Sequence, residues 1–141
     1  MQSTKHLAEL VRHKHDVLVQ LRELGRRQTD LVASGDVSSL LTLLAAKQKL
    51  INALQAIERE LTPYYGEDPE HRVWPSAQVR LDCAERISEC NAILEEIVQL
   101  EKLSAENMTA RRNEVAEQLL RVHSSAQVRG DYEAQRRNQI T

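Results

Sequence analysis

Apolar residues recur every three or four positions along three long stretches of this chain, a spacing that places them on one face of an α-helix. The first stretch, residues 4–33, begins at Ser3 or Thr4, either of which can cap a helix. Polar residues interrupt one of its two apolar rows, at Lys14 and Gln28. The uninterrupted row holds Leu10, Val17, Leu24 and Leu31. This pattern predicts a first amphipathic helix.

Helix-breaking residues divide the chain between these stretches. Gly35 suits the left-handed backbone that ends many helices, and Asp36 can cap the next helix. We therefore expect a second helix over residues 37–62, ended by Pro63. Because the junction is short, the first two helices should be antiparallel neighbours. Residues 63–75, with the sequence PYYGEDPEHRVWP, are expected to form a loop.

The longest stretch without glycine or proline runs for 54 residues, from Ser76 to Arg129. It predicts a third helix over residues 76–122, about 70 Å long at ~1.5 Å per residue. Its continuous apolar row ends near Ser104. Each of the first two helices spans only about 40 Å, so in an up-down-up arrangement the third helix passes the Gly35 turn near the same residue. The continuous row holds Val79, Cys83, Ile87, Cys90, Leu94, Ile97 and Val98.

After Ser104 the chain keeps a sparse apolar row that the shorter helices cannot cover. Because exposed apolar side chains do not stabilise a solvated helix, we interpret this row as a binding surface for a helix of another protein. Two alternatives stay open: the row joins two copies of the chain, or the third helix breaks near Ser104 and folds back. The polar residues 126–141 are expected to form a flexible tail. The expected partner-binding residues are Met108, Val115, Leu119, Leu120 and Val122.

The composition agrees with long helices and limits the possible functions. The 141 residues include no Phe and three Tyr, their formal net charge is −2, and the only Trp, Trp74, is expected to cover one end of the helices. Because acidic and basic residues are balanced along the chain, we expect no nucleic-acid surface. No apolar stretch approaches the ~20 residues of a membrane span, and the N-terminus lacks the apolar core of a signal peptide. We therefore expect a cytoplasmic protein that does not insert into a membrane.

Candidate chemistry is sparse. Cys83 and Cys90 lie about 10 Å apart along a helix, too far for a disulfide, so we expect them to be reduced core residues. His6 and His13 share a helix face, but metal-binding pairs on helices are three or four positions apart. The chain has no glycine-rich phosphate loop and none of the common hydrolase motifs. We predict no metal, no cofactor and no enzymatic activity.

The second helical stretch has two family resemblances. Residues 40–63 superficially resemble the first half of the all-helical chorismate mutases, whose bicarboxylate substrate needs converging cations. One of those cations would fall at Glu58, so this resemblance fails on the residues that would do the chemistry. The chain more closely resembles the FlgN family of flagellar export chaperones over residues 7–125. The matching features are the Gly35-Asp36 break, the residues Leu40, Leu44, Lys47, Leu50 and Leu54, and the long last helix with Asn107, Asn113 and Leu119.

The FlgN resemblance implies a fold and a function. The fold is the one that the helix breakers and the helical periodicity also predict: all-α, an up-down-up antiparallel three-helix bundle or coiled coil with an overlong third helix, in one domain over residues 1–125. The function is that of a non-enzymatic chaperone, which would hold the C-terminal helix of a flagellar hook-associated (hook–filament junction) protein competent for type III export. The alternative is a structural or adaptor coiled coil that self-associates through the C-terminal half of the third helix.

Overall fold

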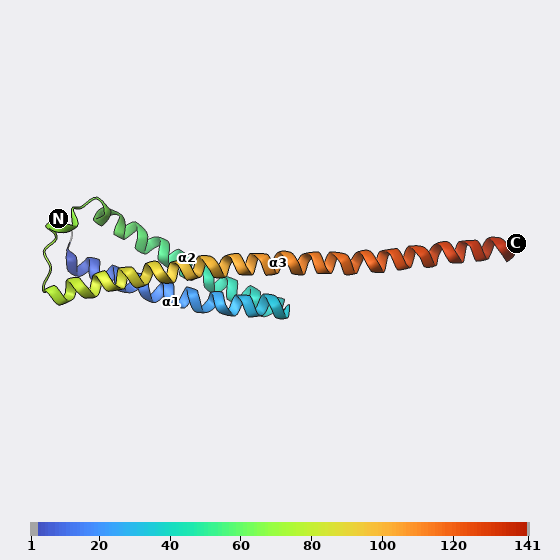
Figure 1. Ribbon diagram of the computed structural model, residues 1–141, viewed down its shortest axis with the longest axis horizontal. Coiled ribbons are helices and arrows are strands. Elements are labelled where there is room, and N and C mark those ends of the chain that lie inside the picture. The colour runs from blue at the N-terminus through green and yellow to red at the C-terminus, as the bar shows by residue number, and fades with distance from the viewer. Residues whose placement is uncertain (1–2, 141) are drawn as a thin grey trace. The chain divides into compact units, whose positions relative to one another are not determined.

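The computed structural model describes residues 3–140, including the side chains of residues 3–110 and 112–121. This part of the chain contains three α-helices and no β-strand (Figure 1). The all-α class expected from the sequence is therefore confirmed. The helices are α1 (Thr4–Ser34), α2 (Val37–Tyr65) and α3 (Ala77–Ile140), and a short 3₁₀ helix, η1 (Pro69–His71), lies between α2 and α3.

The chain divides into two compact units, Met1–Ser104 and Ala105–Thr141. The first unit holds α1, α2 and the first part of α3, and the second holds the rest of α3. The helix assignment continues through Ser104, so the alternative of a helix break at that residue is wrong. None of the described helices is long and apolar enough to cross a membrane.

Two adjacent residues form the turn between α1 and α2. Gly35 has a φ of 74°, which is the left-handed region, and its N–H donates to the carbonyl of Leu31 at 3.0 Å. The carboxylate of Asp36 accepts the backbone N–H of Ser39 at 3.1 Å, and this hydrogen bond lowers the pKa of Asp36. The predicted helix end at Gly35 and the predicted cap at Asp36 are confirmed.

Pro63 does not end the second helix, contrary to the prediction from the sequence, because α2 continues to Tyr65. A proline inside a helix removes one backbone hydrogen bond and costs ~3 kcal/mol or more. Contacts of the next two residues offset this cost. Tyr64 is only 2% exposed and its hydroxyl donates to the carbonyl of Ser3 at 3.0 Å, while the hydroxyl of Tyr65 donates to Glu58 at 3.0 Å. The connecting loop therefore begins after Tyr65.

The third helix also extends further than predicted. The sequence predicts an end near residue 122, whereas α3 continues through Gly130 to Ile140. One glycine in a helix costs ~1 kcal/mol relative to alanine, which is too little to end a helix whose neighbouring residues favour it. The predicted flexibility of residues 126–141 stays a prediction, because the side chains of this segment and the whole of residue 141 lie outside the described residues.

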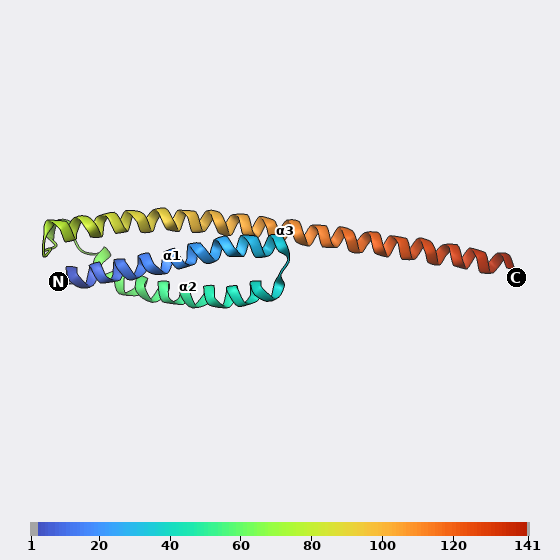
Figure 2. The same ribbon diagram turned by 90° about the horizontal axis from the view of Figure 1, so that it is seen from below.

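In the first unit, α1 lies beside both α2 and α3 (Figure 2). Residues near the start of α1 meet residues near the end of α2, as in the bond from Tyr64 to Ser3, so these two helices run antiparallel. The contacts of α1 with α3 instead advance in the same direction along both helices. They are His15 with Glu89 at 2.8 Å, Arg22 with Glu96 at 3.4 Å and Thr29 with Ser104 at 3.3 Å.

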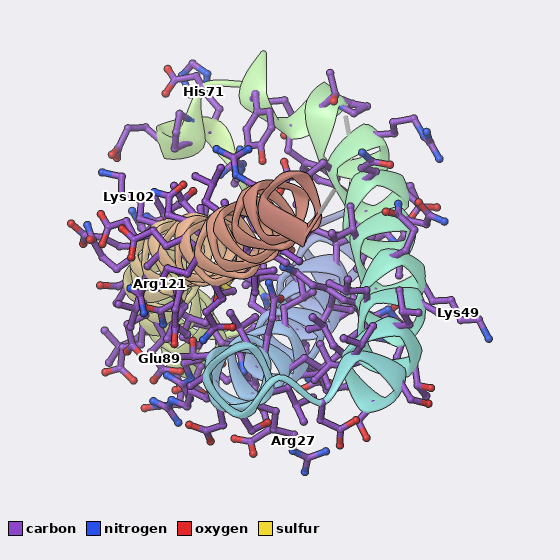
Figure 3. All side chains as sticks on the ribbon, turned by 90° about the vertical axis from the view of Figure 1, so that its right-hand side faces the viewer. Arg27, Lys49, His71, Glu89, Lys102 and Arg121 are labelled. Carbon is purple, nitrogen blue, oxygen red and sulfur yellow. The ribbon has the colours of Figure 1, made fainter. Side chains whose placement is uncertain are left out.

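Two apolar clusters form the core of the first unit. Cys83 belongs to one and Cys90 to the other, and both are buried free thiols, as the sequence predicts. Trp74 packs against the first cluster, at the end where the loop crosses, also as predicted. Charged side chains such as Arg27 and Lys49 point away from the helices (Figure 3). The other buried members are Leu7, Leu10, Val11, Ile57, Leu61 and Tyr64 in the first cluster, and Leu18, Leu21 and Ile93 in the second.

The predicted apolar row of the third helix is only partly buried. Ile87, Leu94 and Val98 are each 40% exposed or more, so the expectation that they share one buried row with the cysteines is wrong. At 100° per residue these three side chains lie to one side of the strip that faces α1, and no neighbouring helix covers that side fully. The buried strip of α3 holds Cys83, Cys90, Ile93 and Ser104.

Candidate partner-binding surface

The buried strip of α3 ends at Ser104. Four residues before Ser104, α1 and α3 approach closely: a Cβ added at Gly25 of α1 would lie 3.2 Å from the Cδ1 atom of Leu100 in α3. The hydroxyls of Thr29 and Ser104 then lie 3.3 Å apart, and Ser104 is only 2% exposed. After Ser104, none of the described side chains of α3 is buried. The end of the buried strip therefore falls where the sequence predicts that cover by the shorter helices ends.

A polar cluster lies beside this point. Lys47 of α2 donates a hydrogen bond to the side-chain carbonyl of Gln28 at 2.9 Å and forms an ion pair with Glu101 of α3. Gln28 interrupts an apolar row of α1 and is only 4% exposed. The hydrogen bond from Lys47 therefore satisfies its buried side-chain carbonyl. This cluster connects all three helices near the end of the buried strip.

The second unit carries the residues that the sequence predicts to bind a partner. Leu119 and Leu120 are each 65% exposed, Val115 is 43% exposed and Met108 is 41% exposed. At 100° per residue, Met108, Val115 and Leu119 lie within about 40° of one another around the helix, and Leu120 lies beside them. We call these four residues the distal stripe. Val122, the fifth predicted residue, lies outside the described side chains.

Charged residues of both signs occur on the same stretch of α3 as the distal stripe. Around the helix axis, Arg112 lies within the range of angles that the distal stripe covers, and in the sequence it lies between Met108 and Val115. Glu117 lies on the opposite side of the helix and pairs with Arg121 at 3.5 Å, with both side chains more than two thirds exposed. Such an exposed pair contributes little to stability. The distal stripe therefore offers apolar contact area beside a basic residue, which suits the binding of another amphipathic helix.

A cavity of about 480 Å³ lies in the first unit, where α1, the end of α2 and α3 meet. Lys14 lines this cavity and its ammonium pairs with Glu58 at 2.7 Å. Burial lowers the pKa of Lys14, but the hydrogen bond and charge of Glu58 outweigh burial, so the net pKa is raised. Burial and the hydrogen bond to the same carboxylate raise the pKa of Tyr65. The ammonium is thus charged and paired, which is unsuited to action as a general base.

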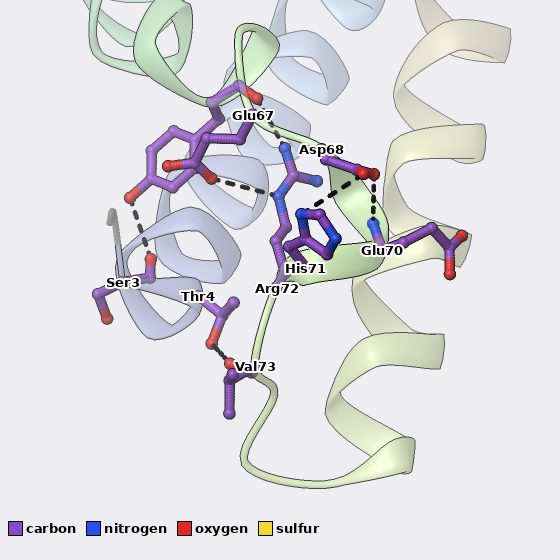
Figure 4. A network of polar contacts seen from close by, with 9 residues as sticks. Ser3, Thr4, Glu67, Asp68, Glu70, His71, Arg72 and Val73 are labelled. Atoms are coloured by element: carbon purple, nitrogen blue, oxygen red, sulfur yellow. Dashed lines mark hydrogen bonds and ion pairs between the residues drawn. The ribbon is translucent and has the colours of Figure 1, made fainter.

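The segment between α2 and α3 closes this end of the first unit (Figure 4). The guanidinium of Arg72 donates to the carbonyl of Tyr64 at 2.7 Å, and its Nε lies 3.5 Å from a carboxylate oxygen of Glu67. The hydroxyl of Thr4 donates to the carbonyl of Val73 at 2.7 Å. These contacts fasten the segment to the end of α2 and to the start of α1, which is a structural role.

The histidines are dispersed. His6 lies against the ring of Tyr64, with ring centroids 6.4 Å apart, and His15 pairs with Glu89 at 2.8 Å. Among the described residues, no group of three His, Cys, Asp or Glu side chains is placed to hold a metal ion. The prediction that the chain binds no metal stays a prediction.

Sequence reasoning missed two features of the first unit. The first is the contact of Glu58 with two residues: its carboxylate pairs with Lys14 and accepts a hydrogen bond from the hydroxyl of Tyr65. A signal was available, since Lys14 interrupts an apolar row of α1 and needs an acidic partner on the neighbouring helix. The second missed feature is that Leu24 and Leu31, both expected in the core, remain half-buried. One apolar face of α1 is therefore only partly covered by the neighbouring helices.

Comparison of the chain with protein-family models, with curated proteins and with solved structures gives no match. The functional interpretation therefore rests on the distal stripe.

Proposed function

We propose that this protein is a non-enzymatic cytoplasmic chaperone. In this proposal the distal stripe binds the amphipathic C-terminal helix of a flagellar hook-associated protein and keeps that protein competent for type III export. The finer fold that belongs to the proposal is an up-down-up three-helix bundle with an overlong third helix. The FlgN resemblance of residues 7–125 suggests the class of client.

The single observation that supports this proposal most is the exposure of the distal stripe. Three large apolar side chains, those of Met108, Val115 and Leu119, lie in one row, with Leu120 next in sequence, on a stretch of α3 in which no described side chain is buried. Full burial of one such side chain contributes ~1.5–3 kcal/mol, so even partial burial of four can support binding. Lost rotational freedom and ordering of the client oppose this gain, and an affinity near micromolar is expected.

The test is co-purification of the tagged full-length chain with hook–filament junction proteins expressed in the same cells. The variant Val115→Asp/Leu119→Asp places two carboxylates in the distal stripe and should abolish co-purification. The matched control Ala110→Asp/Gln118→Asp places two carboxylates on the side of the same helix that lies opposite the centre of the distal stripe, also at exposed positions, and should leave co-purification unchanged.

Three results contradict the proposal. One is no co-purification of any junction protein with the unaltered chain. Another is an equal loss of co-purification in both double variants. The third is a sedimentation mass that halves in the Val115→Asp/Leu119→Asp variant, which instead supports the adaptor alternative, in which the distal stripe joins two copies.

A further inference from the structure

A groove between α1 and α2 of the first unit has no occupant among the described residues. Its volume is about 820 Å³ near Val19 and Leu50, and a second hollow of about 420 Å³ continues it toward Leu31. The two hollows share lining residues, including Leu24 and Ala46, so they form one groove. The 13 residues of α1 from Val19 to Leu31 span about 18 Å, or roughly three turns of a docked helix. We call the groove that the two hollows form the α1–α2 groove.

The walls of this groove have the shape that helix packing requires. On α1 the half-buried Leu24 and Leu31 supply apolar area. On α2 the lining residues are mostly small, so another helix could approach to the 8–10 Å axis separation of packed helices. The small lining residues of α2 are Ser38, Ser39, Thr42, Ala45 and Ala46.

The charges at the groove are predominantly positive. Arg27 stands on the α1 side and Lys49 on the α2 side, and both point into solvent (Figure 3). Lys49 makes no ion pair or hydrogen bond with any described residue. The one acidic lining residue, Glu23, lies 3.5 Å from Arg27 in a pair whose side chains are both more than half exposed, so this pair is weak. Cations therefore flank an apolar floor on both sides.

We propose that the α1–α2 groove binds an amphipathic helix of a partner protein, about three turns long, whose apolar face is flanked by acidic residues. The apolar floor supplies contact area for the partner's leucine-like side chains, and Arg27 and Lys49 select acidic residues at its edges. This surface is separate from the distal stripe. The proposal does not depend on the identity of any flagellar client.

Two synthetic fluorescein-labelled peptides of 14 residues test the proposal by fluorescence anisotropy with the full-length protein. Both carry the same leucines at helical spacing, and they differ only in having Glu or Lys at the flanking positions. We expect the Glu peptide to bind at least tenfold more tightly at low ionic strength, with a smaller ratio at high salt. Because the chain has a net charge of −2, non-specific attraction would favour the Lys peptide instead. Equal binding, or preference for the Lys peptide, overturns the proposal.

Matched variants locate the binding. Ala46→Glu places a larger, acidic side chain in the groove and should weaken binding of the Glu peptide at least tenfold, whereas Ala53→Glu alters an exposed alanine on the same face of α2, beyond the lining residues, and should have a much smaller effect. Lys49→Glu should remove the preference for the Glu peptide, whereas Lys102→Glu, at an exposed position of α3, should preserve it. Circular dichroism of each variant verifies the fold.

Two further results discriminate among occupants. If Ala46→Glu acts no more strongly than Ala53→Glu, the peptide binds elsewhere and the proposal is wrong. If the unaltered chain sediments as a dimer that Ala46→Glu dissociates, a second copy occupies the groove and the proposed partner is wrong. We expect the Val115→Asp/Leu119→Asp variant to bind the Glu peptide normally, so failure of the proposed chaperone function leaves this test intact.

Discussion

Substitutions at Gly25 measure how closely α1 and α3 approach. Glycine inside a helix is ~1 kcal/mol less favourable than alanine, so propensity alone favours Gly25→Ala. Against this gain, the new Cβ would lie 3.2 Å from the Cδ1 and 3.5 Å from the Cβ of Leu100. Because Leu100 is only half-buried, its terminal methyl group can move by a few tenths of an ångström. We expect Gly25→Ala to raise the free energy of unfolding by about 0.5 kcal/mol, part of the propensity gain.

A larger side chain at the same position should have the opposite effect. Gly25→Leu adds three more carbons to the contact with Leu100, and overpacking of this kind typically costs ~1–3 kcal/mol. This cost equals or exceeds the gain of ~1 kcal/mol in helix propensity, so we expect the free energy of unfolding to fall by up to about 2 kcal/mol. The two variants together therefore measure how large a side chain fits between α1 and α3 at this position.

Urea unfolding followed by far-UV circular dichroism gives both free energies. The control is the pair His13→Gly and His13→Ala, because His13 is an exposed position inside α1 and the difference reports glycine-to-alanine propensity without a tertiary contact. If Gly25→Leu proves as stable as Gly25→Ala, α3 does not pack against α1 at this position. That result would refute the close approach and with it the explanation of where the buried strip ends.

Three further outcomes are expected. The pKa of Lys14 is raised in the folded state, so the contribution of Lys14 to stability is complete below its unfolded pKa of about 10.4 and is lost as the pH rises through its folded pKa. Lys14→Met should therefore flatten the alkaline limb of a stability–pH curve measured by urea unfolding. Burial also raises the pKa of Cys83 and Cys90, so both thiols should react with a disulfide reagent at neutral pH much more slowly than in urea, as followed by absorbance. Pro63→Ala restores a backbone donor inside α2 and should raise the free energy of unfolding by about 2 kcal/mol, which is the ~3 kcal/mol cost of the proline less the ~0.4–1 kcal/mol by which proline restricts the unfolded chain.

The sequence predicts helix ends well where one residue decides the backbone conformation. Gly35 and Asp36 act locally, through a left-handed φ and a capping carboxylate, so their effect can be predicted without the rest of the fold. Pro63 is different, because its effect depends on the burial of Tyr64 against residues some 60 positions away. Local preference predicts a stop, and tertiary contacts override it.

The spacing of apolar residues predicts a helix face but not which part of that face is covered. Ile87 and Leu94 fit the same row as Cys83 and Cys90, yet the rotation of α3 against α1 buries the cysteines and exposes the other two. The angular difference is only about 40°, which is smaller than the width of an apolar face. For the same reason the sequence predicts the distal stripe, which depends on helix lengths, but does not predict the α1–α2 groove, which depends on how the helices rotate.

The hydroxyl pair of Thr29 and Ser104 has a consequence for the register of α1 and α3. Helices with apolar residues at seven-residue intervals can slip by seven positions and still bury apolar side chains. A slip of this size toward the start of α3 would place Arg22 opposite Glu89 instead of Glu96, and His15 opposite Asp82, so the ion pairs between α1 and α3 do not oppose it. It would, however, separate Ser104 from Thr29 and place the Thr29 hydroxyl against Ile97. The Thr29–Ser104 hydroxyl pair therefore specifies the alignment of α1 and α3, and the ion pair of Lys47 in α2 with Glu101 in α3 supports the same register, whereas the ion pairs between α1 and α3 leave it ambiguous.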